Sequence, residues 1–125
     1  MKIHFLPIVL LFVLLFSSCG DDVVERSCTN YFLARVDSMY VPDTVLVSDT
    51  IRIFLRGFRG GSSCYDFYQF DSYINNNVLD LEVWGKNEGC TACLAILVGY
   101  SKFFYVTKHH QGIFYIIAHQ PDGSV

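Results

Sequence analysis

The chain lacks features on which several protein classes depend. Only 17% of its 125 residues are charged and the formal net charge is −3, so it has no basic surface of the kind that nucleic-acid binding requires. No segment places apolar residues at the spacing of an amphipathic helix. We therefore expect a small, non-helical domain that does not bind nucleic acid.

The usual catalytic constellations are missing as well. The sequence shows no Ser, His and Asp order typical of a nucleophilic triad, no paired carboxylates with a pocket signal and no glycine-rich phosphate loop. His109 and His110 are neighbours, so their side chains point in opposite directions and are poorly placed to share an ion with His119. We expect no enzyme activity, no metal and no cofactor.

The N-terminal residues have the pattern of an export signal. Lys2 precedes an apolar run of 12 residues, 5–16, and the small residues Ser17 and Ser18 follow it where a signal peptidase cuts. The run is shorter than the roughly 20 residues that a membrane-spanning helix needs. We expect residues 1–18 to be removed on export, which changes the formal net charge from −3 to −4 because Lys2 is lost.

Leu15-Phe16-Ser17-Ser18-Cys19 resembles the lipobox of bacterial lipoproteins, in which the Cys thiol receives a diacylglycerol and becomes the new N-terminus. The chain departs from that pattern at Phe16, where the family prefers Leu. The resemblance implies lipid attachment at Cys19, a polar tether over residues 19–29, and stable anchoring, because two or more acyl chains enter the membrane. The alternative is an ordinary cleaved signal in which Cys19 has no role.

Acidic residues follow the candidate lipidation site at once. Gly20-Asp21-Asp22 resembles the short signal that directs lipoproteins of Bacteroidota to the outer leaflet of the outer membrane. The resemblance implies a bacterial outer-membrane protein exposed on the cell surface. The alternative is a solvated tether, because a polar stretch without apolar periodicity stays disordered.

Four cysteines remain once Cys19 carries lipid, and an even number in an oxidising compartment predicts two disulfides among Cys28, Cys64, Cys90 and Cys93. We prefer Cys64 with Cys90 and Cys28 with Cys93, while the swapped pairing of Cys28 with Cys90 stays open. The CxxC at Cys90 leads into a strand-like run rather than a helix, which argues against a redox motif. A single CxxC also argues against a four-cysteine zinc site.

The rest of the sequence predicts β-strands. Residues 50–56 and 78–84 alternate apolar and polar side chains, which is the pattern of strands with one face buried and one in water. Turn signals separate them from other short candidate strands. The other candidates are residues 31–38, 44–47, 65–74, 93–98, 102–107 and 112–119. This spacing predicts an all-β domain over residues 30–125, an antiparallel β-sandwich.

Four stretches together carry a resemblance to small immunoglobulin-like lipoproteins of Bacteroidota. These are residues 36–45 (VDSMYVPDTV), Asp49-Thr50-Ile51, residues 64–67 (CYDF) and Gly112-Ile113-Phe114. The resemblance implies an immunoglobulin-like fold more than any function. The chain departs from the family at Phe114, where such domains usually carry a corner Tyr.

Outward-facing aromatic and basic residues are the remaining signal. The alternation places Arg52, Phe54 and Arg56 on the water side of one strand and Trp84 on the polar side of another. Exposed aromatic residues with arginine are enriched in contacts with proteins and glycans. We therefore expect a non-enzymatic binding or adhesion module, and Trp84 covered by neighbouring chain is the alternative for that residue.

Two other functions stay open. A small disulfide-stapled inhibitor would present one loop, and residues 58–64 are the candidate. An accessory subunit would be completed by a partner strand added to residues 112–119, which are apolar on both faces and carry no blocking charge. The alternative is that the chain itself covers this edge, through residues 17–40 or 93–98.

Overall fold

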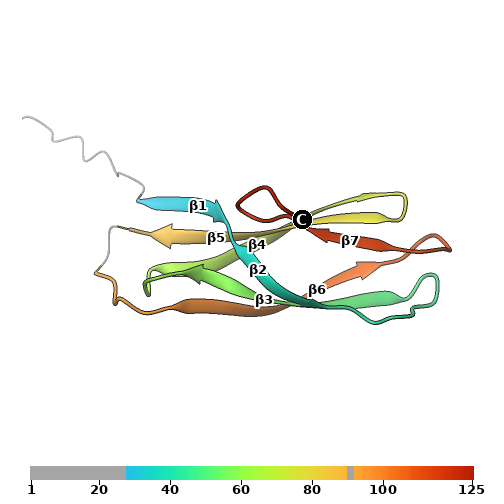
Figure 1. Cartoon of the computed structure of the whole chain (residues 1–125), viewed down its shortest axis with the longest axis horizontal. Coiled ribbons are helices and arrows are strands. Elements are labelled where there is room, and N and C mark those ends of the chain that lie inside the picture. The colour runs from blue at the N-terminus through green and yellow to red at the C-terminus, as the bar shows by residue number, and fades with distance from the viewer. Residues whose placement is uncertain (1–27, 90–91) are drawn as a thin grey trace, which may run out of the picture.

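The computed structural model describes residues 28–89 and 92–125, which form two β-sheets packed face to face and contain no helix (Figure 1). The prediction of an all-β sandwich is therefore confirmed. Sheet 1 consists of β1 (Thr29–Leu33), β4 (Tyr65–Asn75), β5 (Val78–Glu88) and β7 (Tyr115–Ala118). Sheet 2 consists of β2 (Arg35–Tyr40), β3 (Thr50–Gly60) and β6 (Val98–Thr107).

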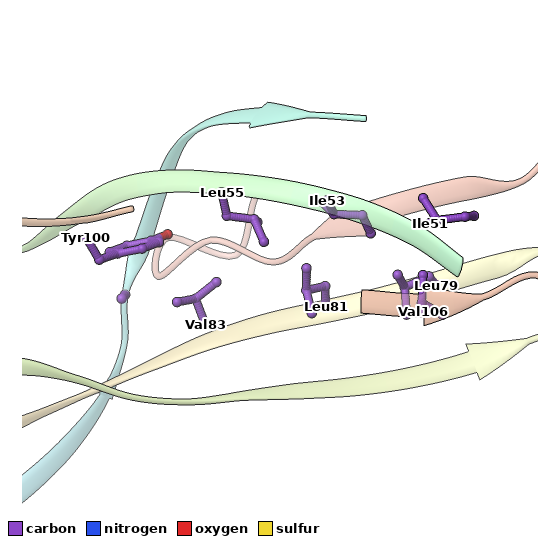
Figure 2. Packing of buried hydrophobic residues seen from close by; sticks show 9 residues of the cluster. Ile51, Ile53, Leu55, Leu79, Leu81, Val83, Tyr100 and Val106 are labelled. Atoms are coloured by element: carbon purple, nitrogen blue, oxygen red, sulfur yellow. The ribbon is translucent and has the colours of Figure 1, made fainter. Parts of the chain in front are cut away.

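The core lies between β3 and β5, the two strands with the clearest alternation. Every second side chain of β3 points inward and meets the inward side chains of β5 (Figure 2). Six of these side chains are at most 2% exposed: Ile51, Ile53, Leu55, Leu79, Leu81 and Val83. Because each such burial is worth about 1.5–3 kcal/mol, the period-two pattern of these strands largely fixes how the sheets face each other.

The N-terminal strands cross from one sheet to the other. β1 pairs with the second half of β5 and β2 pairs with β3, so the single residue Ala34 joins the two sheets. Ala34 is 2% exposed, and its N–H donates to the carbonyl of Val83. The hydroxyl of Tyr100 on β6 donates to the carbonyl of Arg35, 3.0 Å away, immediately after this crossing.

The predicted strand 112–119 forms only the four-residue β7, which pairs in parallel with the first half of β5. Gly112 has a φ of 107°, and its carbonyl accepts a hydrogen bond from Lys108, so the preceding residues make a loop. After β7 the side-chain amide of Gln120 bonds both the N–H and the carbonyl of Val36 in β2. One side of β7 is therefore paired within the chain, and whether a partner strand adds to the other side stays a prediction.

Two other predicted strands are not strands. Residues 44–47 lie in the connection between β2 and β3, where Ser48 has a φ of 73° and Asp49 donates to the carbonyl of Leu46. Residues 93–97 form an exposed connection, and only Val98 of the predicted segment belongs to β6. Both stretches are apolar enough to resemble buried strands, but neither pairs with a sheet.

The preferred disulfide pairing is wrong, because Cys64 is bonded to Cys93, with a Cα–Cα distance of 5.4 Å. The cause is a backbone contact: the N–H of Ser63 donates to the carbonyl of Leu94, which brings the adjacent cysteines together. Cys28 is disulfide-bonded as well. Cys90 lies outside the described residues, as do the predicted signal 1–18, the lipid site Cys19 and the tether up to residue 27.

Candidate binding surface

The outer face of sheet 2 carries a row of aromatic side chains across its three strands. The pairing register places Tyr40 of β2 opposite Phe54 of β3, and Phe54 opposite Phe103 of β6. Paired residues of neighbouring strands point to the same side of a sheet. We call this side the aromatic face; its members are Tyr40, Arg52, Phe54, Arg56, Phe58, Phe103 and Tyr105.

Four side chains of the aromatic face, those of Arg52, Phe54, Phe103 and Tyr105, form a connected set of contacts. The rings of Phe54 and Phe103 lie 5.0 Å apart between centroids, and the guanidinium of Arg52 lies 4.9 Å from the centroid of Phe103. The ring of Tyr105 follows at 6.5 Å from Phe103. Tyr40 is 74% exposed and Tyr105 59% exposed. The contacts hold the rings in place for a ligand, because stacked and cation–π pairs favour fixed geometries.

No acidic side chain points outward from β3 or β6. Arg52 and Arg56 form no ion pair among the described residues, whereas Arg35 at the margin binds Asp37, with Nε 2.9 Å from Oδ1. The aromatic face therefore combines planar apolar surface with two cations that have no anionic partner in this part of the chain. A ligand that carries a negative charge next to a flat apolar surface would bind the arginines with the one and the rings with the other.

The structure places the four predicted binding residues on two different surfaces. Arg52, Phe54 and Arg56 share the aromatic face, but Trp84 lies on β5 and points outward from sheet 1, on the opposite side of the sandwich. Trp84 is half-buried, and its indole N–H donates to Glu82, 2.9 Å away. Its outward direction agrees with the sequence prediction, but the fold separates it from the arginines.

The outer face of sheet 1 is acidic, in contrast to the aromatic face. Asp71 on β4 stands opposite Glu82 on β5. Asp80, also on β5, forms a hydrogen bond with the ring of His119, with Oδ1 2.9 Å from Nε2. These groups line a shallow hollow together with Tyr73. The two outer faces of the sandwich thus differ in the sign of their charge.

Sequence reasoning missed Tyr40, Phe103 and Tyr105 as members of the aromatic face. Phe103, Phe104 and Tyr105 are consecutive aromatics, so alternation alone does not say which of them point outward. The structure shows that Phe104 packs on the core while its two neighbours are exposed. Tyr40 joins the face only through the register of β2 on β3, which no local pattern reveals.

Other chemistry at the described residues is limited. No three His, Cys, Asp or Glu side chains among them lie close enough to hold a metal ion. His109 and His110 are exposed in the loop after β6. Residues 28–89 and 92–125 include no apolar helix of membrane-spanning length.

None of the protein-family models, curated proteins or solved structures compared with the chain matches it.

Proposed function

We propose that the chain is an exported lipoprotein, anchored through Cys19 to the bacterial outer membrane, that acts as a non-enzymatic binding module. The aromatic face is the observation that supports this function most directly. It offers stacked rings beside two cations, and aromatic residues with arginine dominate the binding energy of recognition surfaces. The side chains of this face do not pair a nucleophile with a base.

The ligand that best fits the aromatic face is an anionic glycan, with an acidic protein surface as the second candidate. Sugar rings stack on exposed aromatic side chains, and carboxylates on the sugar would meet Arg52 and Arg56. The acidic outer face of sheet 1 would repel the same ligand. Binding should therefore occur on one side of the sandwich and weaken as salt is added.

A binding assay with a carboxylated polysaccharide tests this proposal. The full chain should bind immobilised polygalacturonate and not neutral dextran. Replacing Arg52 and Arg56 together by Gln should reduce binding by about tenfold or more, because each charge-assisted contact is worth about 1.5–3 kcal/mol. Trp84→Phe, on the opposite face, is the matched control and should bind as the unaltered chain does. Equal binding by the double variant, or loss in the Trp84 variant alone, would place the ligand elsewhere.

The anchor needs its own test. Replacing Cys19 by Ala should move the protein from the detergent extract of membranes to the soluble periplasm or medium, because the acyl chains supply the membrane affinity. The unaltered protein should also carry the mass of the acyl groups. A Cys19→Ala protein that stays with the membrane, together with an unmodified natural chain, would refute the lipobox interpretation.

The immunoglobulin-like assignment belongs to the same proposal. Its support is the N-terminal segment, which gives β1 to one sheet and β2 to the other, as a first strand shared between two sheets would. The inhibitor alternative draws less support, because β3 continues through Gly60 and Arg59 is paired with Asp66. Most of the candidate inhibitor segment 58–64 is thus strand and turn rather than a projecting loop.

A further inference from the structure

The connection that leads into β6 exposes large apolar side chains. Leu94, Ile96 and Leu97 are 70%, 48% and 83% exposed. The sequence holds no charged residue between Glu88 and Lys102. Single exposed apolar residues are common, but several in one uncharged stretch mark a surface that contacts something. We call residues 94–97 the apolar loop.

The apolar loop is fastened to the sandwich. The N–H of Ser63 donates to the carbonyl of Leu94, and the hydroxyl of Ser63 accepts from the N–H of Leu94, both at 2.9 Å. The disulfide between Cys64 and Cys93 adds a covalent link one residue earlier. These bonds fix the backbone of the loop outside the core, so the exposure of its leucine and isoleucine side chains follows from the fold.

The apolar loop lies at the same end of the sandwich as the start of β1 (Figure 1). β1 begins at Thr29 opposite Glu88, and the N–H of Gly89 donates to the carbonyl of Cys28. The part of the mature chain that precedes Cys28 therefore joins the domain at this end. Cys19 lies nine positions before Cys28, a reach of at most about 30 Å for a fully extended chain.

We propose that the apolar loop inserts into the interfacial region of the membrane beside the lipid anchor. This rests on the proposed anchoring at Cys19, since the short tether keeps the same end of the domain close to the bilayer. The loop consists of Leu, Ala and Ile without the aromatic or arginine residues that dominate protein recognition, which favours lipid over a protein partner. Apolar side chains that bind at a membrane interface are buried about 5–10 Å deep, at the boundary between headgroups and acyl chains.

Fluorescence quenching by brominated lipid tests the proposal on the full chain. Leu97→Trp places the reporter in the apolar loop, and Leu46→Trp places it at the opposite end of the sandwich, in the β2–β3 connection, where Leu46 is 73% exposed. Both proteins carry Trp84→Phe so that each has one Trp. They are produced in a Gram-negative host, purified in detergent and reconstituted in phosphatidylcholine vesicles with or without brominated acyl chains, and vesicle binding is measured by flotation.

The expected result is that both proteins float and that quenching at position 97 exceeds quenching at position 46 by about twofold or more. Flotation with equal quenching would overturn the insertion of the apolar loop and leave the anchor intact. Blue-shifted but unquenched emission from the reporter in the apolar loop would show that protein covers the loop, which also overturns the proposal. Failure of both proteins to float would refute the anchor together with the insertion.

Discussion

Replacing Tyr100 by Phe should show how its hydroxyl affects the free energy of unfolding, both through a hydrogen bond and through its ionisation at alkaline pH. Tyr100 is 5% exposed, and its hydroxyl donates to the carbonyl of Arg35 next to the crossing between the sheets. The ring of Phe fills the same space, so the variant loses one part-buried hydrogen bond to the carbonyl of Arg35. At pH 7 we expect the free energy of unfolding to fall by about 1–2 kcal/mol.

The same hydroxyl makes the free energy of unfolding depend on pH in the alkaline range. Burial, assisted by the nearby Asp37 carboxylate, raises the pKa of Tyr100 above its ordinary value, which is about 10 in an unfolded chain. The unfolded state therefore ionises first, so the stabilisation is complete below pH of about 10 and is lost above it, by at most about 1.4 kcal/mol per pH unit. The Phe variant lacks this loss, and the two stabilities should converge at a pH of about 10.7 to 11.5, where the loss equals the contribution of the hydrogen bond.

Urea unfolding of both proteins between neutral pH and pH of about 11.5 measures this convergence. Tyr105→Phe is the matched control, because Tyr105 lies on the same strand but is 59% exposed. This variant should change the free energy of unfolding little at any pH in the range. Two curves that stay parallel through the alkaline range would show that the folded state does not hold the Tyr100 proton. An unchanged stability of Tyr100→Phe at pH 7 would contradict the hydrogen bond itself.

Three further variants test the packing. Replacing Cys64 and Cys93 together by Ser should lower the unfolding free energy by about 3–4 kcal/mol, measured in urea, and an unchanged midpoint would contradict a native disulfide. Gly57→Ala should unfold at a much lower temperature, because the added Cβ would collide with the carbonyl oxygen of Arg35 in β2; a normal melting temperature would refute this close approach. Gln120→Ala should cost about 1–3 kcal/mol in urea unfolding by leaving the backbone groups of Val36 unpaired, and no cost would mean that water replaces the amide.

Alternation predicted the core of this protein well, because burial acts on every second residue of β3 and β5. Ile53 and Leu81, for example, are fully buried as their patterns indicated. The prediction was wrong for residues 93–97, where an apolar composition without alternation indicated a paired strand. A disulfide and two hydrogen bonds to Ser63 keep that stretch outside the sheets, and such long-range bonds leave no periodic trace in a sequence.

The candidate site was predicted in part, for a similar reason. Arg52 and Phe54 are on one outward face because they alternate with buried residues of the same strand. Phe103 joins them through pairing with a strand distant in the sequence, which only the register shows. The prediction that Trp84 points outward with the polar residues of its strand was also correct. The pattern of one strand does not reveal, however, that β5 lies in the other sheet. Faces of strands can be predicted locally, whereas their assembly into one surface depends on topology.

The disulfide at Cys28 has a mechanical consequence. A pull on the chain ahead of β1 would, without it, open the β1–β5 pairs one at a time from Thr29 onward, which requires little force. Cys28 immediately precedes β1 and is disulfide-bonded, so the covalent bond takes the load before the hydrogen bonds do. A domain fastened to a surface by its N-terminal chain would therefore withstand drag in flowing liquid as long as that bond stays oxidised.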